Sequence, residues 1–211
     1  MNVSKKPAYT ILSFARDLPN LCSLTGLFCA LLSLYASLLE QFNLAVVCLL
    51  WATLFDYCDG MLARRIKNRP EVFGRFGVEL DSLIDMVSYA AAPVVFLLSL
   101  SQCSFWILPV LFFMLAATAL RLGFFNIYGL TGENTYTGLS LDHNILVFAF
   151  VFLFQGLFSS GIFLFILCLT FVGVGMLNLA PVPMPKYTGK GVLVVFAYIV
   201  IVTIIYIARI F

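Results

Sequence analysis

Charged side chains are scarce in this sequence. Only 10% of its 211 residues are Asp, Glu, Lys or Arg, whereas 63% are hydrophobic and 16% are aromatic. Soluble domains carry about 25% charged residues, so the composition excludes an ordinary soluble globular protein. The mean hydropathy of +1.07 instead places the chain, residues 1–211, in a lipid bilayer as a single domain. A formal net charge of +2 is too small to favour a nucleic-acid partner.

Histidine is also scarce, and closely paired cysteines are absent. The chain has one histidine, His143, and none of its six cysteines forms a C-x-x-C pair. Clusters of Cys and His bind zinc in structural sites, so a zinc site of that kind is excluded. Most of the cysteines lie in apolar stretches, where an inert buried thiol is the usual role. Residues 1–17 are interrupted by polar and charged side chains, and we expect no cleavable signal peptide there.

Long apolar runs, by contrast, are abundant. A membrane-spanning helix needs about 20 mostly apolar residues. Seven runs are candidates: 20–39, 42–63, 80–100, 104–127, 143–158, 160–180 and 189–210. The runs 143–158 and 160–180 are divided near Ser159, Ser160 and Gly161. We therefore expect an all-α, polytopic transmembrane helix bundle of six to eight spans, with residues 1–18 as an amphipathic segment on the membrane surface.

The basic residues are distributed unevenly between the two sides of this arrangement. With the N-terminus in the cytoplasm, ten of the 12 Lys and Arg residues fall in cytoplasmic segments, and only Arg209 falls on the opposite side. Arg121 lies within the fourth span near its cytoplasmic end. The positive-inside rule therefore predicts a multi-pass protein with a cytoplasmic N-terminus, in a plasma membrane or an organelle membrane. It also places the region 56–81 on the cytoplasmic side.

Four of the ten acidic residues are aspartates that flank the loop between the second and third spans: Asp56, Asp59, Asp81 and Asp85. A carboxylate at membrane depth is costly and usually faces a cavity with a partner. The spacings i,i+3 and i,i+4 put both members of each pair on one face of a helix. Antiparallel helices joined by a short loop can turn these two faces toward each other.

Four carboxylates in one small space repel one another unless a cation is present. Oxygen ligands favour Mg²⁺ or Mn²⁺ over zinc or copper, and two such ions can hold a pyrophosphate between them. Gly60 and Gly77 leave the backbone open to close approach by a substrate. Arg64, one turn beyond Gly60, can pair with a phosphate. The pattern indicates a metal-dependent site for an anionic substrate.

The pattern Asp56-x-x-Asp59-Gly60-x-x-Ala63-Arg64, then Gly77-x-x-x-Asp81-x-x-x-Asp85, resembles the signature of the CDP-alcohol phosphotransferase family. The resemblance implies a two-metal site with Mg²⁺ or Mn²⁺, a homodimer, and transfer of a phosphatidyl group from CDP-diacylglycerol to a small alcohol with release of CMP. It makes all four aspartates metal ligands and Asp85 also the general base. The implied residues of the CDP site are Gly60, Ala63, Arg64 and Gly77. The chain departs from the family in its longer interval between Arg64 and Gly77, which we interpret as a longer cytoplasmic loop around Arg65–Pro70.

The acceptor alcohol is indicated by two further stretches. Residues 79–93 and 119–126 resemble the phosphatidylserine synthase branch of the family, although Phe124 stands where that branch has a second arginine. The segment 136–140 resembles another branch motif, with Ser140 in place of its proline. L-serine is therefore the predicted acceptor, and choline, ethanolamine, inositol and glycerol phosphate are alternatives.

Arg121 and the pair Asp142 and His143 carry less definite predictions. A lone cation near the end of a span needs an anionic partner. Arg121 can bind a substrate carboxylate or phosphate, form an ion pair with a motif aspartate, or extend to the lipid headgroups. Asp142 and His143 stand at the mouth of the next span, where a plain helix start is favoured over contact with a headgroup.

Two other classes of protein compete with the enzyme. A small ion transporter would carry charges near the middle of the bilayer on discontinuous helices, whereas these aspartates cluster at one interface beside an Arg-rich loop. A purely structural membrane protein gives no reason for four aspartates at these spacings. The sequence therefore favours the enzyme.

Overall fold

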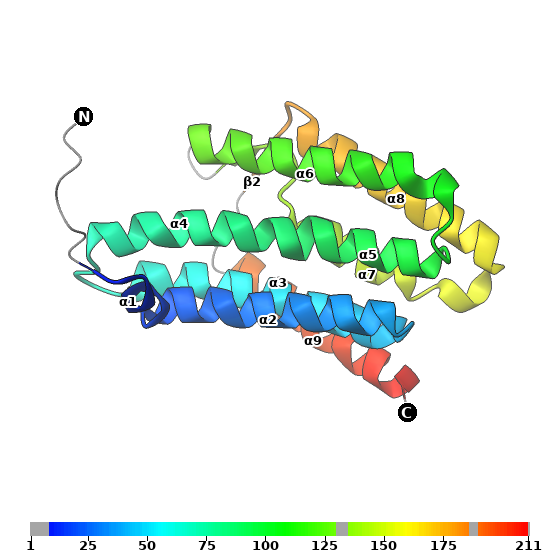
Figure 1. Cartoon of the computed structure of the whole chain (residues 1–211), viewed down its shortest axis with the longest axis horizontal. Helices are drawn as coiled ribbons and strands as arrows, with labels where there is room; N and C mark the ends of the chain where they lie inside the picture. The colour runs from blue at the N-terminus through cyan, green and yellow to red at the C-terminus, as the bar shows by residue number, and fades with distance from the viewer. Residues whose placement is uncertain (1–8, 130–134, 186–189, 211) are drawn as a thin grey trace.

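Helices make up nearly all of the computed structural model, which describes residues 9–129, 135–185 and 190–210. Figure 1 shows the long helices running along one common axis. The α-helices are α1 (Ile11–Ala15), α2 (Leu18–Leu38), α3 (Phe42–Arg65), α4 (Glu71–Asp85), α5 (Ala92–Leu100), α6 (Leu108–Tyr128), α7 (Asp142–Phe152), α8 (Ser160–Leu179) and α9 (Lys190–Ile210). A π-helix, η1 (Met86–Ala91), joins α4 to α5, and the short 3-10 helices are η2 (Phe105–Ile107) and η3 (Gln155–Leu157). Two short strands, β1 (Thr135–Thr137) and β2 (Pro183–Pro185), pair antiparallel.

The helix boundaries follow from local chemistry. Pro19 and Pro109 occupy the first turns of α2 and α6, where proline's missing N–H is not needed. Gly129 ends α6 with a φ of 60°, a conformation that glycine adopts at little cost. The apolar runs between such boundaries form the helices.

The predicted all-α, polytopic bundle is confirmed. Six described helical segments are long and apolar enough to cross a membrane, and they correspond to six of the seven predicted spans. The predicted span 143–158 is a shorter apolar segment, Asp142–Leu157, in which α7 is followed by η3. The predicted break at Ser159 and Ser160 is also confirmed, because α8 begins there.

The third span begins earlier than the sequence predicted. The continuous helical segment is Glu71–Leu100, 30 residues long, rather than 80–100. At 1.5 Å per residue it extends about 45 Å, more than the roughly 30 Å hydrocarbon core of a bilayer. Its N-terminal turns carry the charged residues Glu71, Arg75 and Glu79, so they are the part suited to lie outside that core. These turns are stabilised by packing on α1, where Phe14 stacks on Phe76 and contacts Phe73.

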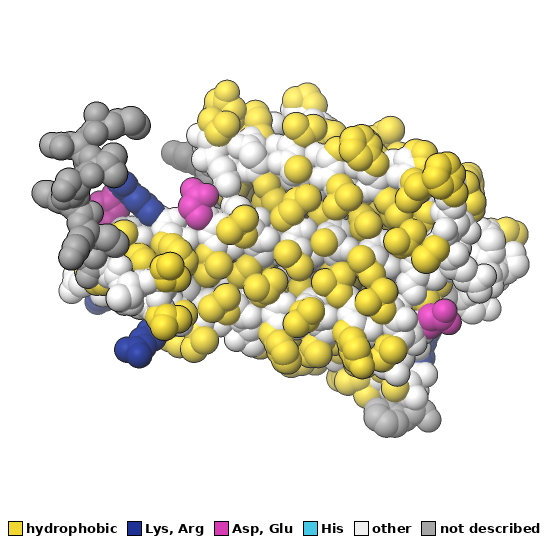
Figure 2. All heavy atoms as spheres, in the orientation of Figure 1, with side chains coloured by type: hydrophobic (Ala, Val, Ile, Leu, Met, Phe, Trp, Pro, Cys, Tyr) yellow, Lys and Arg dark blue, Asp and Glu magenta, His cyan; other side chains and the backbone are white. Residues whose placement is uncertain are grey.

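The surface of the bundle suits a lipid environment. On the face drawn in Figure 2, hydrophobic side chains cover the middle and charged side chains lie toward the two ends. Isolated charges at membrane depth are costly, so this distribution fits a protein that spans the bilayer along its long axis. The predicted amphipathic segment 1–18 stays a prediction, since residues 1–8 lie outside the described part. Within that segment, α1 exposes Ile11 and Leu12.

Buried aromatic rings connect the helices of the core. Phe96 of α5 packs edge-on against Phe148 and Phe152 of α7, with ring centroids 4.9 and 5.1 Å apart. Phe152 also stacks on Tyr206 of α9. The shorter helix α7 is therefore held inside the bundle, and its first residues face the functional site described next.

Candidate active site

One cavity of about 240 Å³ opens among the helices and contains most of the predicted site residues. Its polar and glycine lining consists of Asp56, Tyr57, Asp59, Gly60, Arg64, Asp81, Asp85, Tyr89, Arg121, Tyr136, Ser140, Asp142 and His143. These residues come from α3, α4, η1, α6, β1, α7 and the segment between β1 and α7. Regions far apart in the sequence therefore meet at this cavity.

Three of the four motif aspartates form a tight cluster. Asp56, Asp81 and Asp85 each offer a carboxylate oxygen, and these oxygens lie within 4.8 Å of one another. Asp56 comes from α3, and the other two come from successive turns of α4. The predicted facing of the two helices is thus what brings the carboxylates together.

Asp59 lines the same cavity but has a different partner. Its side chain is 8% exposed, and its carboxylate accepts a hydrogen bond from the hydroxyl of Ser23 on α2. Ser23 lies one turn after Pro19 and Asn20 at the start of α2. The hydroxyl fixes one oxygen of Asp59 and leaves the carboxylate directed at the cavity.

The chemistry of this cluster fits a divalent cation. All of its ligand atoms are carboxylate oxygens, which Mg²⁺ and Mn²⁺ prefer. None of the ion pairs among the described side chains involves any of the four aspartates. Since uncompensated carboxylates at such separations repel one another strongly, a bound cation would supply the missing positive charge.

The predicted residues of the CDP site divide into two groups. Gly60 and Arg64 line the cavity, and a Cβ on Gly60 would meet only the Arg64 guanidinium, at 3.5 Å. Ala63 and Gly77 are not among its lining residues, and their contact with CDP stays a prediction.

Gly77 has a packing role in the structure. A Cβ at this position would lie 2.9 Å from Asn20 Oδ1 and 3.2 Å from Arg69 Nη2. Arg69 also pairs with Asp17. Glycine thus permits α4 to approach the start of α2 closely. The loop predicted around Arg65–Pro70 is the connection 66–70 between α3 and α4, and only Arg65 is helical, as the last residue of α3.

Arg121 projects from α6 into the cavity and is only 6% exposed. Its Nε donates a hydrogen bond to the Leu139 carbonyl at 3.2 Å. The guanidinium carbon lies 5.5 Å and 5.9 Å from the ring centroids of Phe125 and Tyr136, within range of a cation–π interaction. Burial, with a smaller contribution from the charge of Asp142, raises the pKa of Tyr136, so this ring stays a neutral phenol.

This geometry disagrees with two of the three roles predicted for Arg121, the ion pair with a motif aspartate and the extension to the lipid headgroups. No ion pair between Arg121 and an aspartate occurs among the described side chains, and a buried guanidinium does not extend to the lipid headgroups. Phe124, in place of the branch's second arginine, is 41% exposed and packs on Tyr128 with ring centroids 4.6 Å apart. The position of Phe124 is therefore on the outside of the bundle rather than in the cavity lining.

Asp142 and His143 do more than begin a helix. The Asp142 carboxylate accepts hydrogen bonds from the hydroxyls of Tyr57 and Ser140, and His143 Nδ1 lies 3.2 Å from Asp142 Oδ2. Both residues line the cavity. The expectation of a plain helix start missed this network, because Tyr57 is 85 residues away in the sequence.

The segment between β1 and α7 is fixed by close backbone packing. Gly138 has a φ of 77°, and its N–H donates to the Val182 carbonyl at 2.8 Å. A Cβ on Gly138 would lie 2.3 Å from the Asn178 carbonyl oxygen, so only glycine fits. The next N–H, of Leu139, donates to the Leu177 carbonyl at 2.9 Å, and this holds the Leu139 carbonyl under Arg121.

Comparison with known proteins agrees with this site. Residues 16–173 match the family described as CDP-alcohol phosphatidyltransferase. The chain belongs to that family. All four aspartates and Arg121 lie within the matched residues.

Two relatives are similar to this chain over most of their length. The archaetidylserine synthase of Methanothermobacter thermautotrophicus is 30% identical over 176 residues, which are 82% of this chain and 72% of the relative. The CDP-diacylglycerol–serine O-phosphatidyltransferase of Methanocaldococcus jannaschii is 30% identical over 164 residues, 78% of this chain and 73% of the relative. A shorter match, 39% identical over 74 residues, covers 35% of this chain and 25% of the CDP-diacylglycerol–serine O-phosphatidyltransferase of Saccharomyces cerevisiae.

Family membership settles the class of the protein. It is an integral, multi-pass membrane enzyme that transfers a phosphatidyl group to an alcohol, and the ion transporter and the structural protein are set aside. Enzymes of this family generally use a divalent metal, which the carboxylate cluster suits. Sequence reasoning missed Tyr57 and Tyr89 in the site. Of these, Tyr89 had a detectable signal, because it follows Asp85 by four residues on the same helical segment.

Proposed function

We propose that this enzyme transfers the phosphatidyl group of CDP-diacylglycerol to L-serine and releases CMP, with Mg²⁺ or Mn²⁺ bound by Asp56, Asp59, Asp81 and Asp85. The observation that carries the proposal is the composition of one cavity. It combines three carboxylates within 4.8 Å of one another with Asp59 and two arginines, Arg64 and Arg121. Relatives named for serine phosphatidyl transfer support the choice of acceptor.

The carboxylate cluster, Gly60 and Arg64 suit the binding of the CDP-diacylglycerol donor. When bound, divalent cations would neutralise the pyrophosphate and stabilise the charge that develops on CMP as it leaves. Gly60 leaves room beside α3 for the CDP group, and the exposed guanidinium of Arg64 can pair with its phosphates. Arg64 thereby helps to orient the pyrophosphate against the carboxylate cluster.

Asp85 is the proposed general base. The serine hydroxyl oxygen attacks the phosphorus that bears the diacylglycerol, a new P–O bond forms, and the P–O bond to CMP breaks. Asp85 accepts the proton of the attacking hydroxyl, which requires that hydroxyl within about 3 Å of the carboxylate. The products are phosphatidylserine and CMP.

Arg121 is the proposed partner of the serine carboxylate. Its guanidinium is buried and held in place by the Leu139 carbonyl and two aromatic rings, so little side-chain entropy is lost when an anion binds. Serine is the only acceptor in the predicted set whose anionic group is a carboxylate. Choline and ethanolamine have no anionic group, inositol is neutral, and glycerol phosphate carries a phosphate.

The test is a CMP-release assay with purified enzyme, CDP-diacylglycerol, Mg²⁺ and each acceptor in turn. Serine should give CMP and a phosphatidylserine product, and the other acceptors should give much less of either. Because one relative is named for archaetidylserine and others for CDP-diacylglycerol, the assay is repeated with the corresponding archaetidyl donor. Preferential turnover of choline, ethanolamine, inositol or glycerol phosphate would contradict the proposed acceptor.

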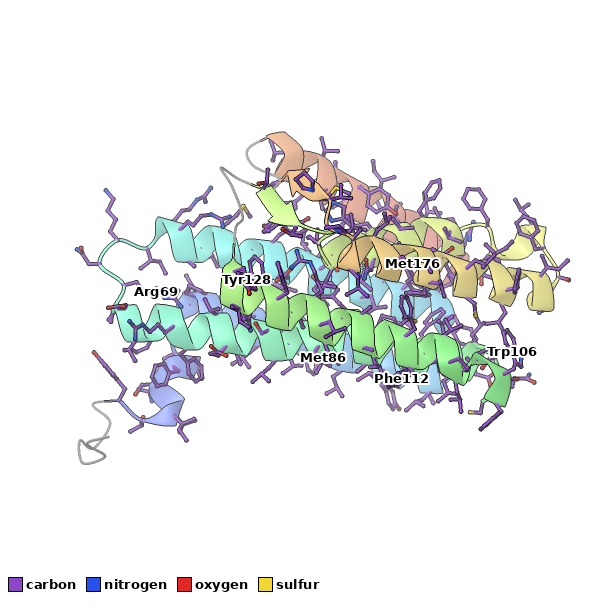
Figure 3. The ribbon with its side chains drawn as sticks, turned by 90° about the horizontal axis from the view of Figure 1, so that it is seen from above. Arg69, Met86, Trp106, Phe112, Tyr128 and Met176 are labelled. Carbon is purple, nitrogen blue, oxygen red and sulfur yellow. The ribbon has the colours of Figure 1, made fainter. Side chains whose placement is uncertain are left out.

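We also propose that the N-terminus and the active site face the cytoplasm. The last turn of α3 carries Arg65, and the connection between α3 and α4 carries Lys67 and Arg69. The α5–η2 connection at the other end of the α4–α5 helical segment carries the exposed Cys103. Figure 3 labels Arg69 near one end of the bundle and Trp106 near the other. A membrane-impermeant maleimide added to intact bacterial cells that express the enzyme in their plasma membrane should therefore label Cys103, and a Cys103→Ser variant is the control. Labelling of Cys103 only after the cells are opened would reverse the proposed orientation.

The family resemblance further supports a homodimer. Chemical cross-linking in native membranes, followed by mass measurement of the purified enzyme in detergent, should give twice the mass of one chain. A monomer by both measurements would contradict this part of the proposal.

A further inference from the structure

A buried tyrosine lies beside the carboxylate cluster and has no role in the reaction described above. Tyr89 is 3% exposed, and its hydroxyl donates a hydrogen bond to Asp56 Oδ2 at 2.8 Å. Asp56 is on α3, whereas Tyr89 is on the helical segment that carries Asp81 and Asp85. The hydroxyl therefore connects the two halves of the cluster.

We propose that Tyr89 is a positioning residue that holds Asp56 in the orientation required for divalent-metal binding, and that the π-helix η1 directs the Tyr89 side chain toward Asp56. The inference rests on the metal requirement in the proposed function but not on the identity of the acceptor alcohol.

The π-helix explains how Tyr89 reaches the cluster. In an α-helix of 3.6 residues per turn, each step of four residues drifts by about 40° around the axis. Asp81, Asp85 and Tyr89 are spaced four residues apart, so a continuous α-helix would carry Tyr89 away from the face of Asp81. In η1 the hydrogen bonds run from i to i+5 and the turn is wider, which opposes that drift. All three side chains line the same cavity.

The position of η1 has a cause in the sequence. Pro93 follows Tyr89 by four residues and lacks the N–H that would bond to the Tyr89 carbonyl in an α-helix. The π-helix Met86–Ala91 occupies the turn before this proline. Single π-turns within helices occur frequently at functional sites, and Figure 3 places Met86, the first residue of η1, midway along the bundle between Arg69 and Trp106.

A neutral donor is suited to this position. Asp56, Asp81 and Asp85 lie close enough to repel one another when no cation is bound, and a free Asp56 side chain would rotate away. The Tyr89 hydroxyl holds one Asp56 oxygen without cancelling the negative charge that a cation needs. Partners that orient the ligands of a metal typically change metal affinity by about 10- to 100-fold when they are removed.

The test measures metal binding directly, apart from turnover. Purified enzyme in detergent is titrated with Mn²⁺, and free Mn²⁺ is followed by electron paramagnetic resonance. Tyr89→Phe keeps the ring and removes only the hydroxyl, so we expect its Kd for Mn²⁺ to rise by about 10- to 100-fold. The Mn²⁺ concentration for half-maximal CMP release should rise by the same factor, and saturating Mn²⁺ should restore most of the turnover.

Tyr206→Phe is the matched control. Tyr206 is also buried, and its hydroxyl donates to the Ala149 carbonyl at 2.6 Å, but it does not line the cavity. Loss of the Tyr206 hydroxyl should change the thermal stability of the enzyme without changing its Kd for Mn²⁺. An unchanged Kd in Tyr89→Phe, or an equal change in both variants, would overturn the proposal.

A second variant separates positioning from packing. In an Asp56→Asn background the side chain no longer contributes a carboxylate ligand, so adding Tyr89→Phe should produce little further loss of Mn²⁺ affinity. A loss as large as in the wild-type background would mean that Tyr89 does not act through Asp56. If the wild-type enzyme itself binds no Mn²⁺ or Mg²⁺, the metal site of the proposed function fails, which is a different result from an unaltered Tyr89→Phe variant.

Discussion

Replacing Arg121 by glutamine removes the buried cation that we assign to the serine carboxylate. A hydrogen bond to a charged group contributes about 1.5–3 kcal/mol, and each 1.4 kcal/mol is about tenfold in affinity. Because Arg121 is only 6% exposed, solvent does not screen this interaction as it would at the surface. We expect the KM for serine to rise roughly 10- to 100-fold, with a smaller effect on kcat.

The assay is steady-state CMP release at varied serine with saturating donor, and then at varied donor with saturating serine. Arg121→Lys keeps the charge but loses the planar fork of donors, so its KM for serine should lie between those of the wild type and Arg121→Gln. Arg209→Gln is the matched control, since Arg209 also lies over an aromatic ring, that of Tyr206 at 5.9 Å, but outside the cavity lining.

One result would refute this reasoning outright. If Arg121→Gln raised the KM for CDP-diacylglycerol and left that for serine unchanged, Arg121 would bind a donor phosphate, the other alternative that the sequence left open. The carboxylate of the acceptor would then need a different partner.

Three further outcomes follow from the same site. Asp85→Asn should abolish CMP release while the protein still folds and inserts, and near-normal turnover would remove Asp85 as the general base. Excess chelator should abolish activity, and added Mg²⁺ or Mn²⁺ should restore it; activity that persists in chelator would contradict the metal mechanism. Gly138→Ala should lower the thermal unfolding midpoint, because its Cβ would lie 2.3 Å from the Asn178 carbonyl oxygen and a positive φ costs a non-glycine residue about 1–3 kcal/mol. An alanine variant as stable as the wild type would show that this backbone contact adapts freely.

The sequence could predict the carboxylate cluster because the geometry of that cluster is mostly local. Spacings of three and four residues place Asp56 with Asp59, and Asp81 with Asp85, on one helical face whatever the rest of the fold does. A short connection makes α3 and α4 antiparallel neighbours. The contact of Asp56 with Asp81 and Asp85 follows from these two facts, and it is what the structure has.

The beginning of the third span was harder to predict because apolar content alone marked it at residue 80. The first turns of α4 carry charged side chains and are held by Phe14 of α1, a tertiary contact. Composition within a window carries no information on such a partner. The predicted span 143–158 likewise rested on apolar content, whereas α7 is short and held inside the bundle by Phe96.

The sequence by itself determined the membrane environment, the helical class and the acidic character of the site, because these depend on composition and on spacings within a single helix. Only the tertiary structure decided which groups surround the aspartates. Ser23 contacts Asp59 across 36 residues of sequence, Tyr89 contacts Asp56 across 33, and Tyr57 contacts Asp142 across 85. Each contact depends on how helices pack and turn relative to one another, and that is set by the shapes of many side chains at once.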